Sequence, residues 1–150
     1  YKRQFLKSTS ASTLELKLLP LNDSVKVICA VSTYFAPAGD SQIAFYDTNW
    51  KELPANNFIQ LPQEDAFYAV PQSDAQADSL KNLKAYADMY LWKADLSADR
   101  PVLSITYTTP DYLDKKTAEA LKRYVVSTPL CYEWKNGKFI RREGLNSLSK

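Results

Sequence analysis

Leu14–Phe35 reads LELKLLPLNDSVKVICAVSTYF, and this stretch indicates the fold more strongly than any other part of the chain. In its first run, leucines alternate with Glu15 and Lys17, which is the period of a half-buried strand with the leucines on its apolar face. After a polar turn at Asn22–Ser24, a second alternating run begins. One face of that run holds Val25, Val27, Cys29, Val31 and Phe35. The stretch therefore predicts two adjoining strands.

The same pattern of three apolar runs occurs twice along the chain. The first copy contains Leu14–Leu21, Val25–Phe35 and Ile43–Tyr46, and it leads into Trp50-Lys51. The second copy contains Met89–Leu96, Pro101–Thr108 and Leu130–Trp134, and it ends in Trp134-Lys135. A recurring pattern of this size is typical of a fold built from similar units. We therefore predict one domain, 1–150, made of two similar halves at about 1–60 and 72–143.

The remaining segments predict helices, turns and short strands. Ser73 and Asp114 have the side chains and positions of helix caps, for helices from Asp74 to about Tyr86 or Ala87 and from Lys115 to about Val125. The connection 53–73 is proline-rich, with a short strand expected at Ala66–Val70. Mostly short connections favour antiparallel pairing, so we predict an α+β fold with seven or eight strands and two helices. We expect the polar tail 144–150 to be mobile.

Composition excludes several classes of function. The 150 residues contain no histidine, which rules out Ser-His-Asp and Cys-His catalysis and removes the commonest transition-metal ligand. We expect no metal site and no cofactor. The net charge is +2, and the basic residues at the two ends lack the aromatic-basic signature of a nucleic-acid-binding module. No apolar stretch approaches about 18 residues, so we expect no transmembrane segment.

Cys29 and Cys131 are the two thiols of the chain. A disulfide between them would stabilise an exported protein. However, Cys29 lies on the apolar face of its run, whereas Cys131 lies on the face opposite Leu130, Tyr132 and Trp134. Free buried cysteines are common, so the pattern favours two free thiols over a bridge.

Two pairs of carboxylates are candidates for acid–base catalysis. Glu64 and Asp65 lie in the proline-rich connection, and Asp111 and Asp114 lie before the second predicted helix. Paired carboxylates are the catalytic groups of glycosidase-type hydrolysis. Asp111 and Asp114 are better explained as helix-start residues, so Glu64 and Asp65 are the stronger catalytic candidates.

Aromatic residues are the remaining clue to function. The chain has 10 tyrosines and three tryptophans, and many of them fall on or beside predicted strands. Such side chains stack on sugar rings and supply contact area for peptides, although they also fill sheet cores. Trp50 and Trp134 are the candidates for an exposed binding cluster because each ends its strand at a turn. Tyr46 and Tyr132 lie on the same two strands and complete the predicted binding residues.

Three segments carry a resemblance to a known family: STLELKLLPL at Ser12–Leu21, FYDTNWKELP at Phe45–Pro54 and ITYTTP at Ile105–Pro110. Over most of its length the chain resembles an uncharacterised family of secreted or periplasmic proteins from Gram-negative gut anaerobes, classed only as a domain of unknown function. The resemblance implies an exported protein whose precursor has a signal peptide and a further N-terminal segment not present here. It supplies no catalytic residue. The two-halves pattern is also similar to β-lactamase-inhibitor-like tandem units, a likeness of fold alone.

Two functional interpretations remain open. The favoured one is a non-catalytic module, periplasmic or secreted, that binds a protein, peptide, glycan or envelope component through an aromatic-rich sheet face. The alternative is a carboxylate-dependent hydrolase that uses Glu64 and Asp65. The first interpretation requires an exposed aromatic patch, and the second requires polar groups that converge in a concave pocket.

Overall fold

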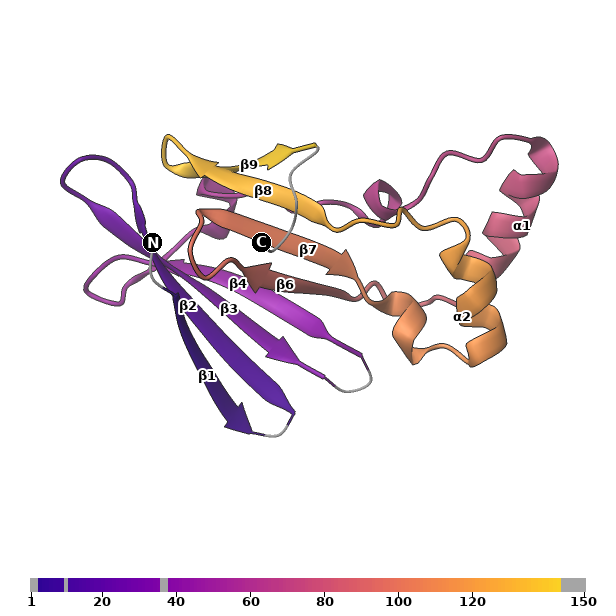
Figure 1. Cartoon of the computed structure of the whole chain (residues 1–150), viewed down its shortest axis with the longest axis horizontal. Helices are drawn as coiled ribbons and strands as arrows, with labels where there is room; N and C mark the ends of the chain where they lie inside the picture. Colours follow the sequence, from indigo (N-terminus) through magenta and orange to yellow (C-terminus); the bar gives the residue numbers. More distant parts are fainter. Residues whose placement is uncertain (1–2, 10, 36–37, 144–150) are drawn as a thin grey trace.

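A computed structural model describes residues 3–9, 11–35 and 38–143 of the chain. In this part of the chain, nine strands form two antiparallel sheets, and two α-helices lie together at one end (Figure 1). The first sheet contains, in order, β1 (Arg3–Thr9), β2 (Ser12–Pro20), β3 (Lys26–Tyr34), β4 (Asp40–Tyr46) and β5 (Glu52–Leu53). The second sheet contains β6 (Trp92–Leu96), β7 (Val102–Tyr107), β8 (Leu130–Lys135) and β9 (Lys138–Arg142). The predicted α+β class with antiparallel sheets and two helices is confirmed.

The helices and short 3-10 turns lie outside the sheets. The helices are α1 (Asp74–Lys84) and α2 (Lys115–Lys122), and the 3-10 turns are η1 (Ala55–Asn57), η2 (Glu64–Phe67) and η3 (Thr109–Tyr112). Both predicted caps are present, because Ser73 Oγ accepts a hydrogen bond from Gln76 N and Asp114 Oδ2 accepts one from Thr117 N. Each helix ends two or three residues before the predicted position. Neither helix in the described part of the chain has the length and apolar character to cross a bilayer.

Each sheet is a meander in which every strand pairs with its neighbour in sequence. The three runs of the first copy become β2, β3 and β4, and those of the second copy become β6, β7 and β8. The strand count is nine instead of seven or eight, partly because the two-residue β5 has no periodic signal. An internal duplication stays a prediction.

The strand expected at Ala66–Val70 is wrong. Its beginning belongs to η2, and only an isolated bridge joins Tyr68 to Val125. The ring of Phe67 instead stacks on that of Tyr107, with centroids 5.2 Å apart. Two backbone hydrogen bonds accompany the bridge, from Ala69 N–H to the Tyr124 carbonyl and from Val126 N–H to the Phe67 carbonyl. The stacked ring and this short pairing hold the segment against the core without a longer ladder.

The hydrophobic core lies between the two sheets. The first sheet contributes Val27, Cys29, Val31 and Phe45, all fully or almost fully buried. The second sheet contributes Ala94, Leu96, Leu103, Ile105, Tyr132 and Trp134. Each large apolar side chain buried here contributes about 1.5–3 kcal/mol to folding. The predicted inward face of the run 25–35 is confirmed for Val27, Cys29 and Val31. It is wrong for Val25 and Phe35, which lie just outside β3 and are exposed.

The orientation of β2 is the reverse of the sequence-based interpretation. Glu15, Lys17 and Leu19 point to the interior and are at most 4% exposed, whereas Leu18 on the opposite face is 44% exposed. Leu14 and Leu16 share that outer face. The reason lies in the pairing with β3, because Lys17 pairs with Cys29 and Leu19 pairs with Val27, both buried. Side chains of directly paired residues point to the same side of a sheet, so the burial of β3 decides the orientation of β2.

The two buried charges of β2 connect the sheets. Lys17 Nζ donates hydrogen bonds to the carbonyl oxygens of Ser97 and Arg100, at 2.6 and 2.8 Å. The Glu15 carboxylate accepts a hydrogen bond from Arg3 at 2.8 Å, and Arg3 also donates to the Leu96 carbonyl. Buried charges are tolerated only when such partners are present. We call Arg3, Glu15 and Lys17 the polar clasp.

Candidate binding groove

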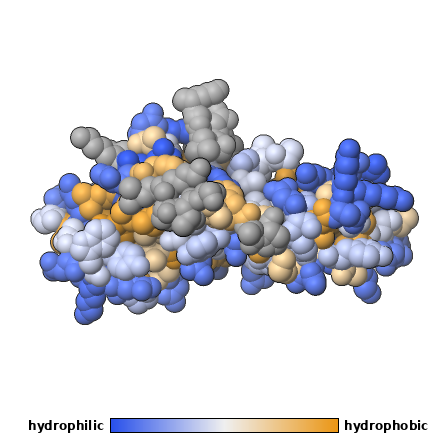
Figure 2. Space-filling view, turned by 90° about the horizontal axis from the view of Figure 1, so that it is seen from below, coloured by the Kyte–Doolittle hydropathy of each residue, from blue (hydrophilic) through white to orange (hydrophobic). Residues whose placement is uncertain are grey.

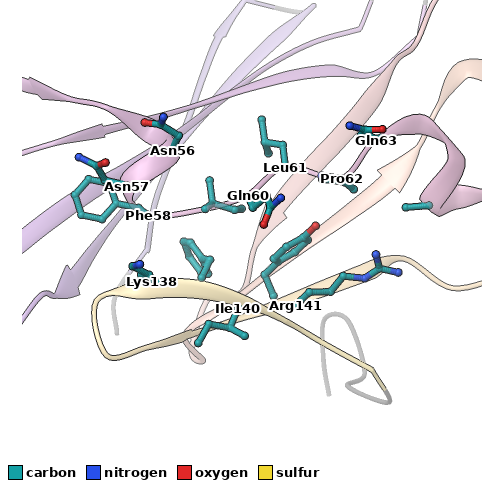
Figure 3. Close-up of a pocket in the computed structure, with 14 residues that line it drawn as sticks. Asn56, Asn57, Phe58, Gln60, Leu61, Pro62, Gln63, Lys138, Ile140 and Arg141 are labelled. Carbon is teal, nitrogen blue, oxygen red and sulfur yellow. The ribbon is translucent and has the colours of Figure 1, made fainter.

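A groove of about 550 Å³ lies between the segment 56–63 and β9. The side chains of Tyr132 and Phe139 also line it. In Figure 3, Asn57 and Lys138 lie at one end of the groove and Arg141 lies at the other, while Gln60 lies between the two walls. The volume is in the range of cavities that hold small molecules or short peptide segments.

Aromatic packing and backbone hydrogen bonds hold the segment 56–63 in place. The Phe58 ring stacks on Phe45, with centroids 4.8 Å apart, and lies 6.2 Å from Trp134. The Phe139 N–H donates to the Phe58 carbonyl at 2.7 Å, and Ile59 forms a parallel bridge with Phe139. These contacts fix one wall of the groove on the core, so the groove is formed before any ligand arrives.

Amides and cations dominate the polar lining. The amide side chains are Asn56, Asn57, Gln60 and Gln63, and the cations are Lys138 and Arg141. None of the lining residues, all in the described part of the chain, is an aspartate or glutamate. Burial raises the pKa of the Tyr132 hydroxyl, and the positive charge of Arg141 lowers it in part. The groove is therefore a polar, positively charged cavity that suits a neutral or anionic ligand.

The four predicted binding residues lie in different places. Tyr132 lines the groove, although the residue is only 2% exposed. Trp134 is buried in the core at 6% exposure, so its expected exposure is wrong. Its indole N–H donates to the Pro20 carbonyl at 2.7 Å, which ties β8 to the end of β2. Trp50 is 60% exposed, and its ring lies 6.0 Å from that of Tyr46.

Tyr46 lies on the outer face of the first sheet, and Trp50 lies beside it in the turn after β4. Leu18, Ile28 and Tyr46 form one row across β2, β3 and β4 on this face. Apolar residues reach the surface at the end of the molecule that contains the sheets, on the left of Figure 2. This face is the aromatic-bearing surface closest to the one the sequence predicts.

The carboxylates of the hydrolase hypothesis do not converge. Glu64 accepts a hydrogen bond from the Tyr107 hydroxyl at 2.5 Å, and the Tyr68 and Tyr107 hydroxyls lie 2.7 Å apart. Asp65 is exposed and pairs with Lys84 at 3.1 Å. Neither carboxylate lines the groove.

The second carboxylate pair has structural roles. Asp114 caps α2, and Asp111 lies 3.9 Å from Lys122 in an exposed ion pair. The described residues contain no cluster of three or more His, Cys, Asp or Glu side chains that could hold a metal ion.

The two cysteines are buried and are not joined by a disulfide. Cys29 faces the interior between the sheets, and burial raises the pKa of its thiol far above the usual range. Cys131 pairs with Ser104 and lies on the opposite face of the second sheet from Tyr132 and Trp134. A sheet therefore separates the two sulfur atoms, which explains why they form no bridge.

Sequence reasoning missed the groove. Its two walls come from segments far apart in the chain, and neither wall shows a known motif. A signal was present in the amide-rich stretch from Asn56 to Gln63, which is too polar for a strand and has four carboxamides within eight residues. That stretch alone does not reveal its partner wall in β9.

The fold and the groove together define a small α+β domain with two antiparallel sheets and a polar cavity beside the edge strand of one of them. Over residues 2–139 the chain matches the family described as "Protein of unknown function (DUF3256)", and it belongs to this family. The predicted membership of a family of unknown function is confirmed. Export and the source organisms stay predictions.

A solved structure shows the same fold. It is described as "Structure of a domain of an uncharacterized protein from Porphyromonas gingivalis W83". The two chains share 29% sequence identity with a TM-score of 0.86, and the match covers 95% of this chain and 71% of the other. No curated protein matches the chain.

Proposed function

We propose that this chain is a non-catalytic binding module whose ligand site is the groove between the segment 56–63 and β9. The observation that carries the proposal is the lining of the groove, where four carboxamides and two cations surround a preformed cavity of about 550 Å³. Carboxamides and hydroxyls orient a ligand through hydrogen bonds, and the cations favour negative charge. Among the binding residues predicted from sequence, Tyr132 belongs to this site.

Binding fits the groove better than hydrolysis does. A hydrolase of the carboxylate type needs two acidic side chains on either side of the scissile bond. The lining of the groove has no acidic side chain, and Glu64 and Asp65 have other partners. A groove of amides, cations and one tyrosine can hold and orient a ligand without supplying such a pair.

The same proposal places the module in the periplasm or outside the cell. Its support is the sequence resemblance of Ser12–Leu21, Phe45–Pro54 and Ile105–Pro110 to exported proteins. Fractionation of native cells, followed by protease treatment of intact cells and of spheroplasts, measures this directly. Recovery of the protein in the cytoplasmic fraction alone would contradict an exported module.

Titration of ¹⁵N-labelled protein with soluble oligosaccharides and short peptides tests the site. We expect a ligand that binds to shift the backbone amide signals of 56–63 and 138–141. Gln60→Ala removes a carboxamide from the groove and should weaken binding about tenfold, the effect of one or two lost hydrogen bonds. Trp50→Ala is the matched control, because it removes an aromatic side chain from the turn beside the outer sheet face and should leave the affinity unchanged.

Three outcomes would contradict a non-catalytic binding site in the groove. If binding survives Gln60→Ala and is lost in Trp50→Ala, the ligand binds the outer face of the first sheet. If no member of the panel shifts the groove signals, the chain has no ligand site there. Release of hydrolysis products during the titration would show that the chain is an enzyme and not a non-catalytic binding module.

A further inference from the structure

The edge of β9 offers backbone hydrogen-bonding groups to the groove. In an antiparallel pair, residues alternate between those whose N–H and C=O point to the partner strand and those whose groups point away. Phe139 pairs with Trp134 on β8, yet its N–H donates outward to the Phe58 carbonyl. Arg141 is two residues further along the same strand and pairs with Tyr132. Its backbone N–H and C=O therefore point away from β8, to the side of the groove.

This edge already accepts one extended segment. Among the described residues, backbone pairing of β9 with the segment 56–63 is limited to the parallel bridge of Ile59 with Phe139 and the hydrogen bond from Phe139 to Phe58. No backbone hydrogen bond from a described residue reaches the outward groups of Arg141. The groove opens where the pairing stops, so the strand edge continues along one wall of the cavity.

The positive charges of the side chains around this edge favour an acidic ligand. Lys138 and Arg141 are exposed, line the groove and face no acidic side chain within it. Arg142, on the other side of the strand, lies 3.4 Å from Glu133, so that cation is already paired. An arginine with no carboxylate partner can bind one from a ligand through charge-assisted hydrogen bonds.

We infer that the groove binds an extended acidic peptide segment that adds as a strand to the free edge of β9. This inference rests on the proposed function and names its ligand class. The backbone of the peptide pairs with Arg141, and its carboxylates pair with Lys138 and Arg141. Strand addition draws affinity from main-chain hydrogen bonds and specificity from alternate side chains. The edge from Lys138 to Arg141 matches about four to six residues of an extended chain at about 3.3 Å each.

Fluorescence anisotropy with the labelled six-residue peptide Glu-Glu-Val-Val-Glu-Glu, which carries carboxylates on both faces of an extended chain, tests the inference. We expect the double variant Lys138→Glu, Arg141→Glu to bind this peptide at least about tenfold more weakly, because two charge-assisted contacts become repulsive. The double variant Lys115→Glu, Lys116→Glu is the matched control. It makes the same total charge change at exposed positions of α2, outside the groove, and should change the affinity less than about twofold. Circular dichroism on each variant confirms that the fold persists.

Two further peptides, tested on the wild-type protein, measure how backbone hydrogen bonds and peptide charge contribute to the affinity. The same sequence N-methylated at alternate residues cannot donate its ladder hydrogen bonds, so we expect at least about tenfold weaker binding. The same peptide with lysine in place of each glutamate should not bind. If the methylated peptide binds as tightly as the unmethylated one, strand addition is wrong. If the basic peptide binds as tightly as the acidic one, the preference for an acidic ligand is wrong.

Titration with a trimer of galacturonic acid, an acidic ligand that is not a peptide, tests the proposed function independently of the peptide inference. If the trimer shifts the groove signals and the acidic peptide does not, the groove remains a binding site and the peptide inference fails. If neither ligand shifts them and the wider panel also fails, both are wrong. Binding of the acidic peptide, with loss in Lys138→Glu, Arg141→Glu and retention in Lys115→Glu, Lys116→Glu, supports both.

Discussion

Trp50-Lys51 and Trp134-Lys135 are the same dipeptide at comparable places in the two sheets, yet their tryptophans have opposite environments. Trp50 is 60% exposed, whereas Trp134 is 6% exposed. Trp50 lies in the turn after β4, with a φ of 64°, and Asp47 accepts a hydrogen bond from its N–H. Trp134 lies within β8 and packs against Phe45, Phe58 and Phe139.

The difference shows that position within a strand decides burial more than residue type does. The last residue with regular strand geometry still points to one face of its sheet, but a residue in the following turn does not. The Asp47 carboxylate accepts hydrogen bonds from the backbone N–H groups of Asn49 and Lys51, which builds a local turn. Trp50 is carried out of the sheet by this turn, whereas in the second sheet the Asn136-Gly137 turn begins after Trp134-Lys135.

The largest expected effect separates the two tryptophans directly. Trp134→Ala removes packing against three aromatic rings and the hydrogen bond to Pro20, so we expect unfolding to become easier by about 3–5 kcal/mol. Trp50→Ala should change the free energy of unfolding by no more than about 0.5 kcal/mol. Urea denaturation of both variants measures the contrast. Similar losses in the two variants would show that the first-sheet tryptophan is buried in solution.

The next effect tests which face of β2 is internal. Lys17→Met removes the donor to the Ser97 and Arg100 carbonyls, so we expect a loss of about 1–3 kcal/mol, although removing the buried charge offsets part of it. Leu18→Met introduces the same residue on the outer face and should have an effect within about 0.5 kcal/mol. Thermal unfolding of both variants gives the answer. A neutral Lys17→Met together with a destabilising Leu18→Met would reverse the orientation that the structure gives to this strand.

We expect a smaller effect on stability from replacing a glycine beside a strand of each sheet. Gly137 has a φ of 81°, and a Cβ there would lie 2.9 Å from Leu21 Cδ1. We therefore expect Gly137→Ala to destabilise the protein by about 1–2 kcal/mol. A Cβ on Gly39 would lie 3.1 Å from Cδ of the flexible Lys93 side chain, so Gly39→Ala should be better tolerated. Equal melting temperatures of the two variants would contradict the left-handed turn in the second sheet.

The smallest effect concerns the pH dependence that the polar clasp gives to the first sheet. Burial raises the pKa of Glu15 above its ordinary value of 4.5, and Asp95 adds to the rise while Arg3 opposes it. Glu15 thus binds its proton more tightly in the folded state than in the unfolded state. Its contribution to stability is full below the unfolded pKa and is lost as pH rises through the folded pKa.

Urea denaturation of the wild type and Glu15→Gln across this pH range measures that contribution. The free energy of unfolding of the wild type minus that of Glu15→Gln should fall as pH increases. A constant difference would show that Arg3 cancels the effect of burial on this pKa, and a difference that grows with pH would show that Arg3 outweighs burial.

Sequence predicted the local features that depend on neighbouring residues. The caps Ser73 and Asp114 and the inward face of β3 follow from spacing of a few residues. The orientation of β2 could not be predicted in the same way. Period-two alternation distinguishes two faces but does not say which is buried, and the adjacent Leu18 and Leu19 supply an apolar residue to each.

The candidate site was less predictable than the fold. Tyr132 was identified from its strand, but its partners in the groove, Gln60 and Arg141, belong to segments that only tertiary packing brings together. Glu64 had the right residue type for catalysis, yet its hydrogen bond with Tyr107 depends on a contact across the fold. A site that is built from two segments far apart in the chain produces no periodic sequence pattern in either segment.

The nearest-neighbour order of the strands has a consequence during synthesis. The first sheet closes by successive short connections, and such local contacts form fast, whereas β7 and β8 of the second sheet are separated by η3 and α2. When the ribosome has released only the first sheet, Phe45 and the other inward residues of that sheet still face water. The nascent protein is therefore most prone to aggregation between completion of β5 and arrival of the second sheet, a window in which a chaperone that binds apolar surface would protect it.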